Sequence, residues 1–390
     1  MLNFSKLLSL AAMLLPLSVQ AGFFSPAAGS IGSTAVANTD ASIEAWATGY
    51  IDYTPGVEAD VQFQTPLKAL GESGNSDGNN AGVAFDIVSL GRGGSITLTF
   101  ATPVVDGNGY DFAVYENSFS DTFLELATVE VSSDGINFVK FPPMSLTPSA
   151  VGGFGTVYAT DVAQLAGKYR GGYGTPFDLA QLDGNPLLDV NNVLYVRLTD
   201  VTGDGSVVNE ISLQNVADWA GMAVGDLPGF VVDQVNAAPA AIYDPYPTVS
   251  SAGFDLDAVA VLNQLKTVVI DIEPTDINNE VNPDSTGTME VAVLTTSTSS
   301  GEVVDFNAAD IDPATLKFAY ADAPVAAGPT PEDVDGDTDL DAVFDFNIQD
   351  TGIVCDDTEA TLRGETYSGE PFSGTDFITT TDCDSGGCHP

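Results

Sequence analysis

Five aspartates occupy alternate positions of the nonapeptide 333–341, with Gly336 between the second and the third. Carboxylates at this spacing suit Ca²⁺, which takes about six to eight oxygen ligands in irregular geometry, while a glycine permits the tight turn of a short loop. Without a cation the five carboxylates would repel one another, so the spacing favours a calcium loop over a merely solvated one. The expected ligands are the side chains of Asp333, Asp335, Asp337 and Asp341 and the backbone carbonyl of Asp339.

A second group of acidic and amide side chains stands where other predicted strands end. Oxygen ligands gathered at the ends of strands can hold a structural Ca²⁺. Alternatively, these side chains cap turns and accept hydrogen bonds from nearby backbone amides, and the sequence leaves both interpretations open. The residues of this weaker second site are Asp111, Glu116, Asn117, Asp200, Asp255 and Asp257.

The C-terminal sequence places Cys383, Cys388 and His389 close together, and His389 is the one histidine of the chain. Covalent haem needs two thiols beside a histidine, commonly with two residues between the thiols, whereas four separate them here. Cys388 and His389 could therefore bind a c-type haem, contact a haem protein or contact another subunit. A frayed end or an intermolecular contact is favoured over haem. Three cysteines leave three disulfide connectivities open.

Catalytic constellations are missing from the sequence. A Ser-His-Asp or Cys-His arrangement would have to draw its base from His389 at the C-terminal end. Paired carboxylates could hydrolyse a glycosidic bond, but no feature selects two acids among the 55 present. We therefore expect a protein that is not an enzyme.

Two tyrosine clusters on predicted loops could form a platform for a carbohydrate ligand, because tyrosine offers a flat apolar face with a polar edge. The more ordinary interpretation is that such Gly-Tyr and Tyr-Pro clusters stiffen a loop. The residues concerned are Tyr169, Tyr173, Tyr243 and Tyr246. Their exposure side by side would favour the glycan interpretation.

The formal charge of −45, from 55 acidic against 10 basic residues, repels phosphates and anionic lipid surfaces and excludes nucleic acid as a partner. Residues 1–21 read as an export signal, with Lys6, an apolar run at 7–17 and small residues before the cleavage point. That run is shorter than the roughly 20 residues of a spanning helix. We expect cleavage before Gly22 and secretion to the bacterial cell surface without membrane insertion.

Short alternating segments separated by Gly, Asn and Asp turns favour an antiparallel β-sandwich. Strands are expected at 96–100, 111–115, 127–131, 136–140, 194–198, 258–262, 267–272, 289–294 and 315–318. Helix is sparse, with 41–48 as a candidate, and the proline-bearing segment 321–332 is expected to be a loop.

The mature chain of about 370 residues exceeds what one core usually organises. The predicted fold class is all-β, with two antiparallel β-sandwich domains. The first spans 22–265 with an insertion near 206–241, the second spans 266–383 and carries the acidic loop, and 384–390 is a tail.

Five segments carry a resemblance to a known family: LGRGGSITL (90–98), YDFAVYEN (110–117), VEVSSDG (129–135), LAGKYRGGYGTPFD (165–178) and GFDLDAV (253–259). Through them, residues 80–262 resemble a family of secreted bacterial cell-surface proteins, many with C-terminal sorting tails. This resemblance implies a jelly-roll-like first domain and a surface location. The chain departs from the family in its insertion at 206–241 and in lacking a hydrophobic sorting helix.

The second domain resembles a module that often follows such regions, through VIDIEP (269–274), EDVDGD (332–337) and TEATLRG (358–364). The resemblance implies a smaller Ig-like sandwich and a disulfide between Cys355 and Cys383. The acidic loop is similar to the D-x-D-G-D loops of thrombospondin-type, dockerin and integrin-blade repeats, and it differs from an EF-hand, whose glycine stands sixth.

These observations predict a secreted calcium-binding surface protein with a structural or adhesive role, whose partners are other surface proteins or further copies of itself. The alternative is a calcium-dependent carbohydrate-binding protein. A third reading is a partner of a haem protein through Cys388 and His389.

Overall fold

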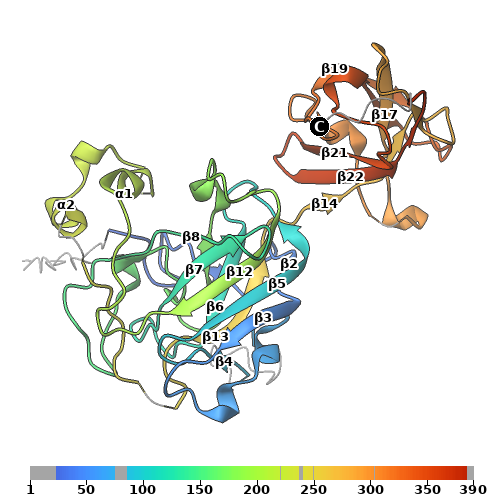
Figure 1. The fold of residues 1–390 in the computed structure, drawn as a ribbon. Helices are drawn as coiled ribbons and strands as arrows, with labels where there is room; N and C mark the ends of the chain where they lie inside the picture. The colour runs from blue at the N-terminus through green and yellow to red at the C-terminus, as the bar shows by residue number, and fades with distance from the viewer. Residues whose placement is uncertain are drawn as a thin grey trace, which may run out of the picture.

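The computed structural model describes residues 23–74, 86–219, 221–236, 240–248, 250–302 and 304–383. The expected export signal at 1–21 and the tail residues Cys388 and His389 lie outside the described residues. Strands dominate the described ranges and most pair antiparallel (Figure 1), which confirms the all-β prediction. None of the described helices is long and apolar enough to cross a membrane.

The first sandwich consists of two sheets. One runs in the order β1 (Val36–Ala37), β11 (Tyr173–Phe177), β6 (Phe112–Glu116), β13 (Asp255–Val261) and β2 (Ala45–Trp46), with β4 (Val88–Ser89) also paired to β13. The other runs in the order β3 (Gly49–Thr54), β5 (Ser95–Val104), β12 (Val193–Asp200), β7 (Ala127–Ser132) and β8 (Val139–Lys140). A separate short pair joins β9 (Met144–Ser145) to β10 (Val162–Ala163).

The burial pattern along each strand of the first sandwich reflects whether one or both of its faces are covered. Along β12 the buried Val196 and Leu198 alternate with more exposed residues, because one face of that sheet meets solvent. Strand β13 is buried along its whole length, as expected of a strand covered on both faces. Three rings, Phe112, Phe141 and Phe177, lie in mutual contact with centroids 5.0 to 5.9 Å apart and join the two layers.

The second sandwich has two four-stranded sheets. One runs β14 (Lys266–Thr267), β22 (Pro371–Phe377), β21 (Glu359–Glu365) and β18 (Lys317–Phe318), and the other runs β15 (Ile270–Ile272), β17 (Thr288–Val293), β20 (Asp341–Asn347) and β19 (Val325–Glu332). Strand β16 (Glu280–Val281) pairs with β23 (Thr379–Thr380), and this pair is parallel, as is β14 with β22. Its core includes Phe318, Phe344, Phe346 and Phe372.

The two sandwiches have separate cores. The largest hydrophobic cluster of the first draws on residues 45–261 and that of the second on residues 268–378, with no residue in common. In Figure 1 the chain passes from one to the other by way of β14.

Helices are few and short. The segment 206–241 contains α1 (Leu213–Trp219) and α2 (Gly229–Asn236), which the sequence did not indicate. The 3₁₀ helices are η1 (Val61–Phe63), η2 (Pro66–Ala69), η3 (Ala159–Asp161), η4 (Leu179–Leu182), η5 (Val224–Asp226), η6 (Thr298–Ser300), η7 (Ala308–Asp310) and η8 (Ile348–Asp350).

Two expectations about local structure are wrong. The segment 41–48 contains no helix; it contributes β2, whose Ala45 and Trp46 pair with β13, so tertiary pairing overrides a weak helix preference. The segment 321–332 contains the strand β19 rather than only a loop. Its prolines are tolerated because β19 lies at the edge of its sheet and its pairing with β20 shifts register twice.

Candidate functional site

The acidic nonapeptide connects two paired strands. Residues 333–340 form the tip of the hairpin between β19 and β20. Gly336 adopts φ +85° and Thr338 φ +86°, and these two left-handed residues let the loop reverse tightly. The hairpin therefore presents alternate aspartates at one end of the second sandwich.

Two of the predicted ligands meet an acid from elsewhere in the chain. Ligand oxygens of Asp335, Asp337 and Glu302 lie within 4.8 Å of one another. Glu302 follows η6, and its Oε2 accepts a hydrogen bond from Ser297 N at 2.6 Å. Sequence spacing could not indicate Glu302, because it lies more than 30 residues before the loop and joins it only through folding.

Asp333 and Asp341 already serve the loop backbone. Asp333 Oδ1 accepts bonds from Gly336 N at 2.9 Å and Thr338 N at 3.4 Å. Asp341 is 2 % exposed, and its two oxygens accept bonds from Thr295 N and Val334 N, each at 2.8 Å. Both carboxylates of these predicted ligands therefore hold the loop in shape.

Asp339 offers a side-chain oxygen in addition to the backbone carbonyl that the sequence predicts as a ligand. Its side-chain Oδ1 is buried and has no hydrogen-bond partner. Burial of the carboxylate, with the negative charge of Asp337 as the next cause, raises the pKa of Asp339 to about 6. The pKa of Asp335 is raised as well, by burial first and then by neighbouring acids. Such a crowd of anions favours a cation at its centre.

The six residues of the predicted second site do not form one site. Glu116 ends β6 and Asp255 begins β13, and these ends coincide because the two strands are antiparallel neighbours. Asn117 N donates to the Asp255 carbonyl oxygen at 3.2 Å. The structure thus brings Glu116, Asn117 and Asp255 together, as the strand-end argument predicts.

Asp111, at the other end of β6, is about 16 Å along the strand from Glu116 and belongs to a different group. Its Oδ1 accepts bonds from Gly107 N and Asn263 Nδ2, and its Oδ2 from Leu179 N. It lies with Asp106 and Asp178, ligand oxygens of all three being within 4.8 Å of one another. Burial raises the pKa of Asp111 to about 7.

Asp200 and Asp257 follow the turn-capping alternative. Asp200 accepts bonds from Phe254 N at 2.7 Å and Gly93 N at 2.8 Å, one on each oxygen. Asp257 accepts bonds from Ser73 Oγ at 2.5 Å and Gly74 N at 3.0 Å. Their carboxylates fasten loops to strand ends.

Two further buried acids belong to the group around Glu116 and Asp255, and sequence reasoning missed both. They are Glu125, 5 % exposed, and Asp244, 2 % exposed. Burial and the charge of Asp255 raise the pKa of Glu125 well above its ordinary value, and burial and the charge of Asp200 do the same for Asp244. The signal for Glu125 was its place inside the apolar run 123–127.

The four tyrosines do not form one exposed platform. Tyr169 is 1 % exposed, and its hydroxyl lies 2.9 Å from both Ser25 Oγ and Thr34 Oγ1. Tyr173 and Tyr246 lie against the guanidinium groups of Arg170 and Arg92, and Tyr243 is half-buried. Buried and paired in this way, the rings stiffen loops.

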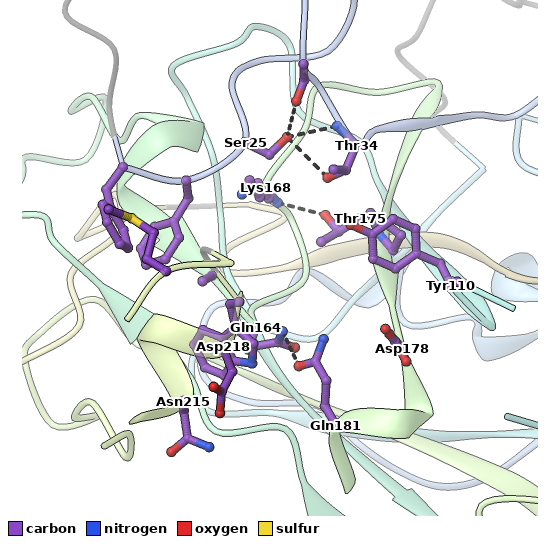
Figure 2. Close-up of a pocket in the computed structure, with 18 of the residues that line it drawn as sticks. Ser25, Thr34, Tyr110, Gln164, Lys168, Thr175, Asp178, Gln181, Asn215 and Asp218 are labelled. Atoms are coloured by element: carbon purple, nitrogen blue, oxygen red, sulfur yellow. Dashed lines mark hydrogen bonds between the residues drawn. The ribbon is translucent and has the colours of Figure 1, made fainter. Parts of the chain in front are cut away.

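A large cavity was not indicated by the sequence. It measures about 1160 Å³, and its walls come from the distant segments 23–34, 109–110, 163–181 and 215–230. Figure 2 shows Gln164 and Gln181 hydrogen-bonded to each other on one side, and Ser25 and Thr34 bonded on another. Helices α1 and α2 supply part of its wall.

Lys168 is the buried cation of that cavity. Its Nζ donates to the Val162 carbonyl oxygen at 2.8 Å and lies 5.7 Å from the Tyr169 ring centroid and 5.8 Å from that of Phe24. Burial lowers the pKa of Lys168 to about 7. A mixed polar and apolar cavity of this kind suits a small amphipathic ligand.

The disulfide between Cys355 and Cys383 is present, with an S–S distance of 2.09 Å, which confirms the pairing implied by resemblance. Cys383 therefore has no free thiol for a covalent bond to haem. Cys388 and His389 lie outside the described residues.

Comparison with known protein families finds no match for this chain, and comparison with curated proteins finds no significant match. The resemblance to secreted surface proteins therefore stays a prediction, and the function is inferred from the sites themselves.

Proposed function

We propose that this chain is a secreted calcium-binding protein of the bacterial cell surface, with a structural or adhesive role. The observation that carries the proposal is the acidic loop: oxygens of Glu302, Asp335 and Asp337 converge within 4.8 Å of one another, and the charges of Asp335 and Asp337 also act on the neighbouring Asp339. Calcium is the expected ion because the donors are hard oxygens in an irregular loop, whereas Mg²⁺ demands a stricter octahedron.

The ion would stabilise the second sandwich at one end. It would hold the tip of the β19–β20 hairpin against the segment after η6, because that segment contributes Glu302 as a ligand. Surface exposure of the loop and the charge of −45 suit an extracellular protein that depends on calcium for rigidity and contacts its neighbours through sheet edges.

Calcium-dependent carbohydrate binding is the second candidate, and one observation favours it. Phe119, Phe123 and Phe154 form a row of stacked rings with centroids 5.8 and 6.0 Å apart, and Phe119 and Phe154 are largely exposed. Saturable binding of a glycan by monomers would support this candidate. Association that grows with protein concentration in the presence of Ca²⁺ would support the structural role.

The test is the Ca²⁺ stoichiometry of the mature chain by calorimetry, with melting measured with and without chelator. Asp335→Asn/Asp337→Asn removes two convergent carboxylates, so one ion should be lost. Wild type at about 100 times the Kd should melt roughly 5 to 15 °C above its chelated form. In the variant this difference should shrink.

The matched control is Glu280→Gln/Asp284→Asn, which neutralises two acids of the same sandwich that lie exposed and outside the acidic loop. It should keep the ion and the wild-type response to chelator. Equal ion content in wild type and the loop variant would contradict the proposal.

A further inference from the structure

A small cavity lies at the end of the first sandwich where β6 ends and β13 begins. It measures about 160 Å³, and its walls include Glu116, Asn117, Glu125 and Asp255, each less than one-tenth exposed. The hydroxyl-bearing Thr248 and Ser251 line it too. Its polar wall therefore consists of oxygen-bearing groups drawn from four segments of the chain.

Several of these oxygens lack a hydrogen-bond partner. They are Asn117 Oδ1, Glu125 Oε1 and Asp255 Oδ1. An unsatisfied polar atom in a protein interior costs about 1 to 3 kcal/mol, and more when it is charged. All three are acceptor oxygens, so together on one small cavity they indicate a ligand that is a cation or donates hydrogen bonds to them.

The charges around the cavity show what kind of ligand this is. Glu116, Glu125 and Asp255 are all buried acids, and the charges that act on Glu116 are those of Glu125 and Asp255. The charge of Glu125 also acts on the buried Asp244, which has an unpartnered Oδ1 of its own. Buried acids of this number must either take up protons or be compensated by a cation.

The wall of the cavity contains no basic side chain among the described residues, and Arg92 is engaged elsewhere. Arg92 acts on Asp200, forms an ion pair with Glu58 and stacks over Tyr246. It is not part of the cavity wall. The carboxylates of Glu116, Glu125 and Asp255 therefore face the cavity itself.

We propose that this cavity is a second divalent-cation site, in which Ca²⁺ is bound by side-chain oxygens of Glu116, Asn117, Glu125 and Asp255. Four protein ligands leave positions for water, since Ca²⁺ takes about six to eight oxygens. The volume allows this, because a water molecule occupies about 30 Å³ of liquid. The site extends the proposed calcium dependence to the first sandwich and stands apart from the acidic loop.

The key ligand, Glu125, separates this site from a turn cap. In a turn, carboxylate oxygens accept backbone amides, as both oxygens of Asp200 do. Glu125 also interacts with the Gly253 backbone and the Thr248 hydroxyl, but its buried Oε1 has no partner, on a residue flanked by the fully buried Leu124 and Leu126. That placement costs stability unless an ion binds.

The experiment counts Ca²⁺ ions by calorimetry on the mature chain, comparing wild type, Glu125→Gln/Asp255→Asn and the control Glu72→Gln, an exposed glutamate of the same sandwich. The cavity variant should bind one ion fewer than wild type and the control. In chelator it should melt at or above wild type, because neutral side chains relieve the buried repulsion. A merely structural role for Glu125 predicts the opposite change in melting.

A second measurement does not depend on the variants. Crystals of wild type soaked in Tb³⁺ should show anomalous density in the cavity. Density absent there, or an unchanged ion count in the variant, would overturn the inference. The loop variant Asp335→Asn/Asp337→Asn separates the two sites. If only the loop variant loses an ion, the proposed function holds and the cavity site is wrong. If only the cavity variant loses an ion, the cavity site holds and the proposed role of the acidic loop is wrong.

Discussion

Buried carboxylates in this chain fall into two kinds according to what their oxygens contact. Asp200 and Asp341 each accept a backbone amide on both oxygens, so they fix loop geometry and need the full acceptor capacity of a carboxylate. Glu125 and Asp255 keep one oxygen without a partner. Neutralising a residue of the first kind breaks bonds, whereas neutralising one of the second kind removes repulsion.

The pair Asp106 and Asp111 gives a pH dependence that can be measured. Burial raises the pKa of Asp106 to about 6 and that of Asp111 to about 7. The folded state therefore binds these two protons more tightly than the unfolded chain does. Their contribution to the free energy of unfolding is complete below about pH 4 and is lost as pH rises towards 7. In chelator, the free energy of unfolding should fall over this interval.

Asp106→Asn should make that fall smaller by about 1 kcal/mol, a figure lowered for solvent screening of the half-exposed Asp106. The check is a set of denaturant titrations from pH 4 to 7.5 on both proteins. Parallel curves for the two would rule out this pair as a source of the pH dependence.

At the scale of elements, alternation and turn residues predicted nine segments that contain strands, because a half-buried strand shows its period in the sequence, but they missed longer strands such as β3, β11 and β20 to β22. The pattern failed where position in a sheet decided the outcome: β19 holds its prolines as an edge strand. The site was half predictable for the same reason. Spacing gives Asp335 and Asp337 of one loop, but Glu302 and Glu125 reach their sites only through folding.

One loop depends on a glycine that can be tested against its neighbour. A Cβ on Gly153 would lie 2.1 Å from the Pro247 carbonyl oxygen, whereas a Cβ on Gly152 meets nothing within 4 Å. Gly153→Ala should therefore displace the loop that carries the exposed Phe154 and cost about 1 to 3 kcal/mol. Gly152→Ala should leave stability nearly unchanged.

Limited chymotrypsin digestion measures this effect beside the melting temperature. Cleavage after Phe154 should be faster in Gly153→Ala than in wild type or Gly152→Ala. Equal digestion and equal melting in the two variants would show that the contact with Pro247 does not hold the loop.

At the scale of the whole molecule, separate cores and one disulfide predict two independent unfolding transitions. Cys355 and Cys383 both lie in the second sandwich, 28 residues apart, and closing a loop of that length stabilises by about 3.6 kcal/mol. Reductant, or Cys355→Ser/Cys383→Ser, should lower one transition by roughly 5 to 15 °C and leave the other in place.

Differential scanning calorimetry distinguishes the outcomes. A single transition that moves as one under reductant would show that the sandwiches unfold together. Calcium titration of the same samples should raise the temperatures of both transitions. In the loop variant, the reductant-sensitive transition should no longer respond to calcium.

The proposed secretion and calcium binding would together give the buried acids of the first sandwich a role in where the chain folds. Cells keep free calcium low in the cytosol, so a newly made chain there would meet the full repulsion among Glu116, Glu125 and Asp255. An exported protein must reach its channel unfolded, and this repulsion would delay collapse until that point. Outside the cell, where calcium is plentiful, the same carboxylates would bind the ion. Folding of the first sandwich would then be coupled to calcium binding and would be completed only after export.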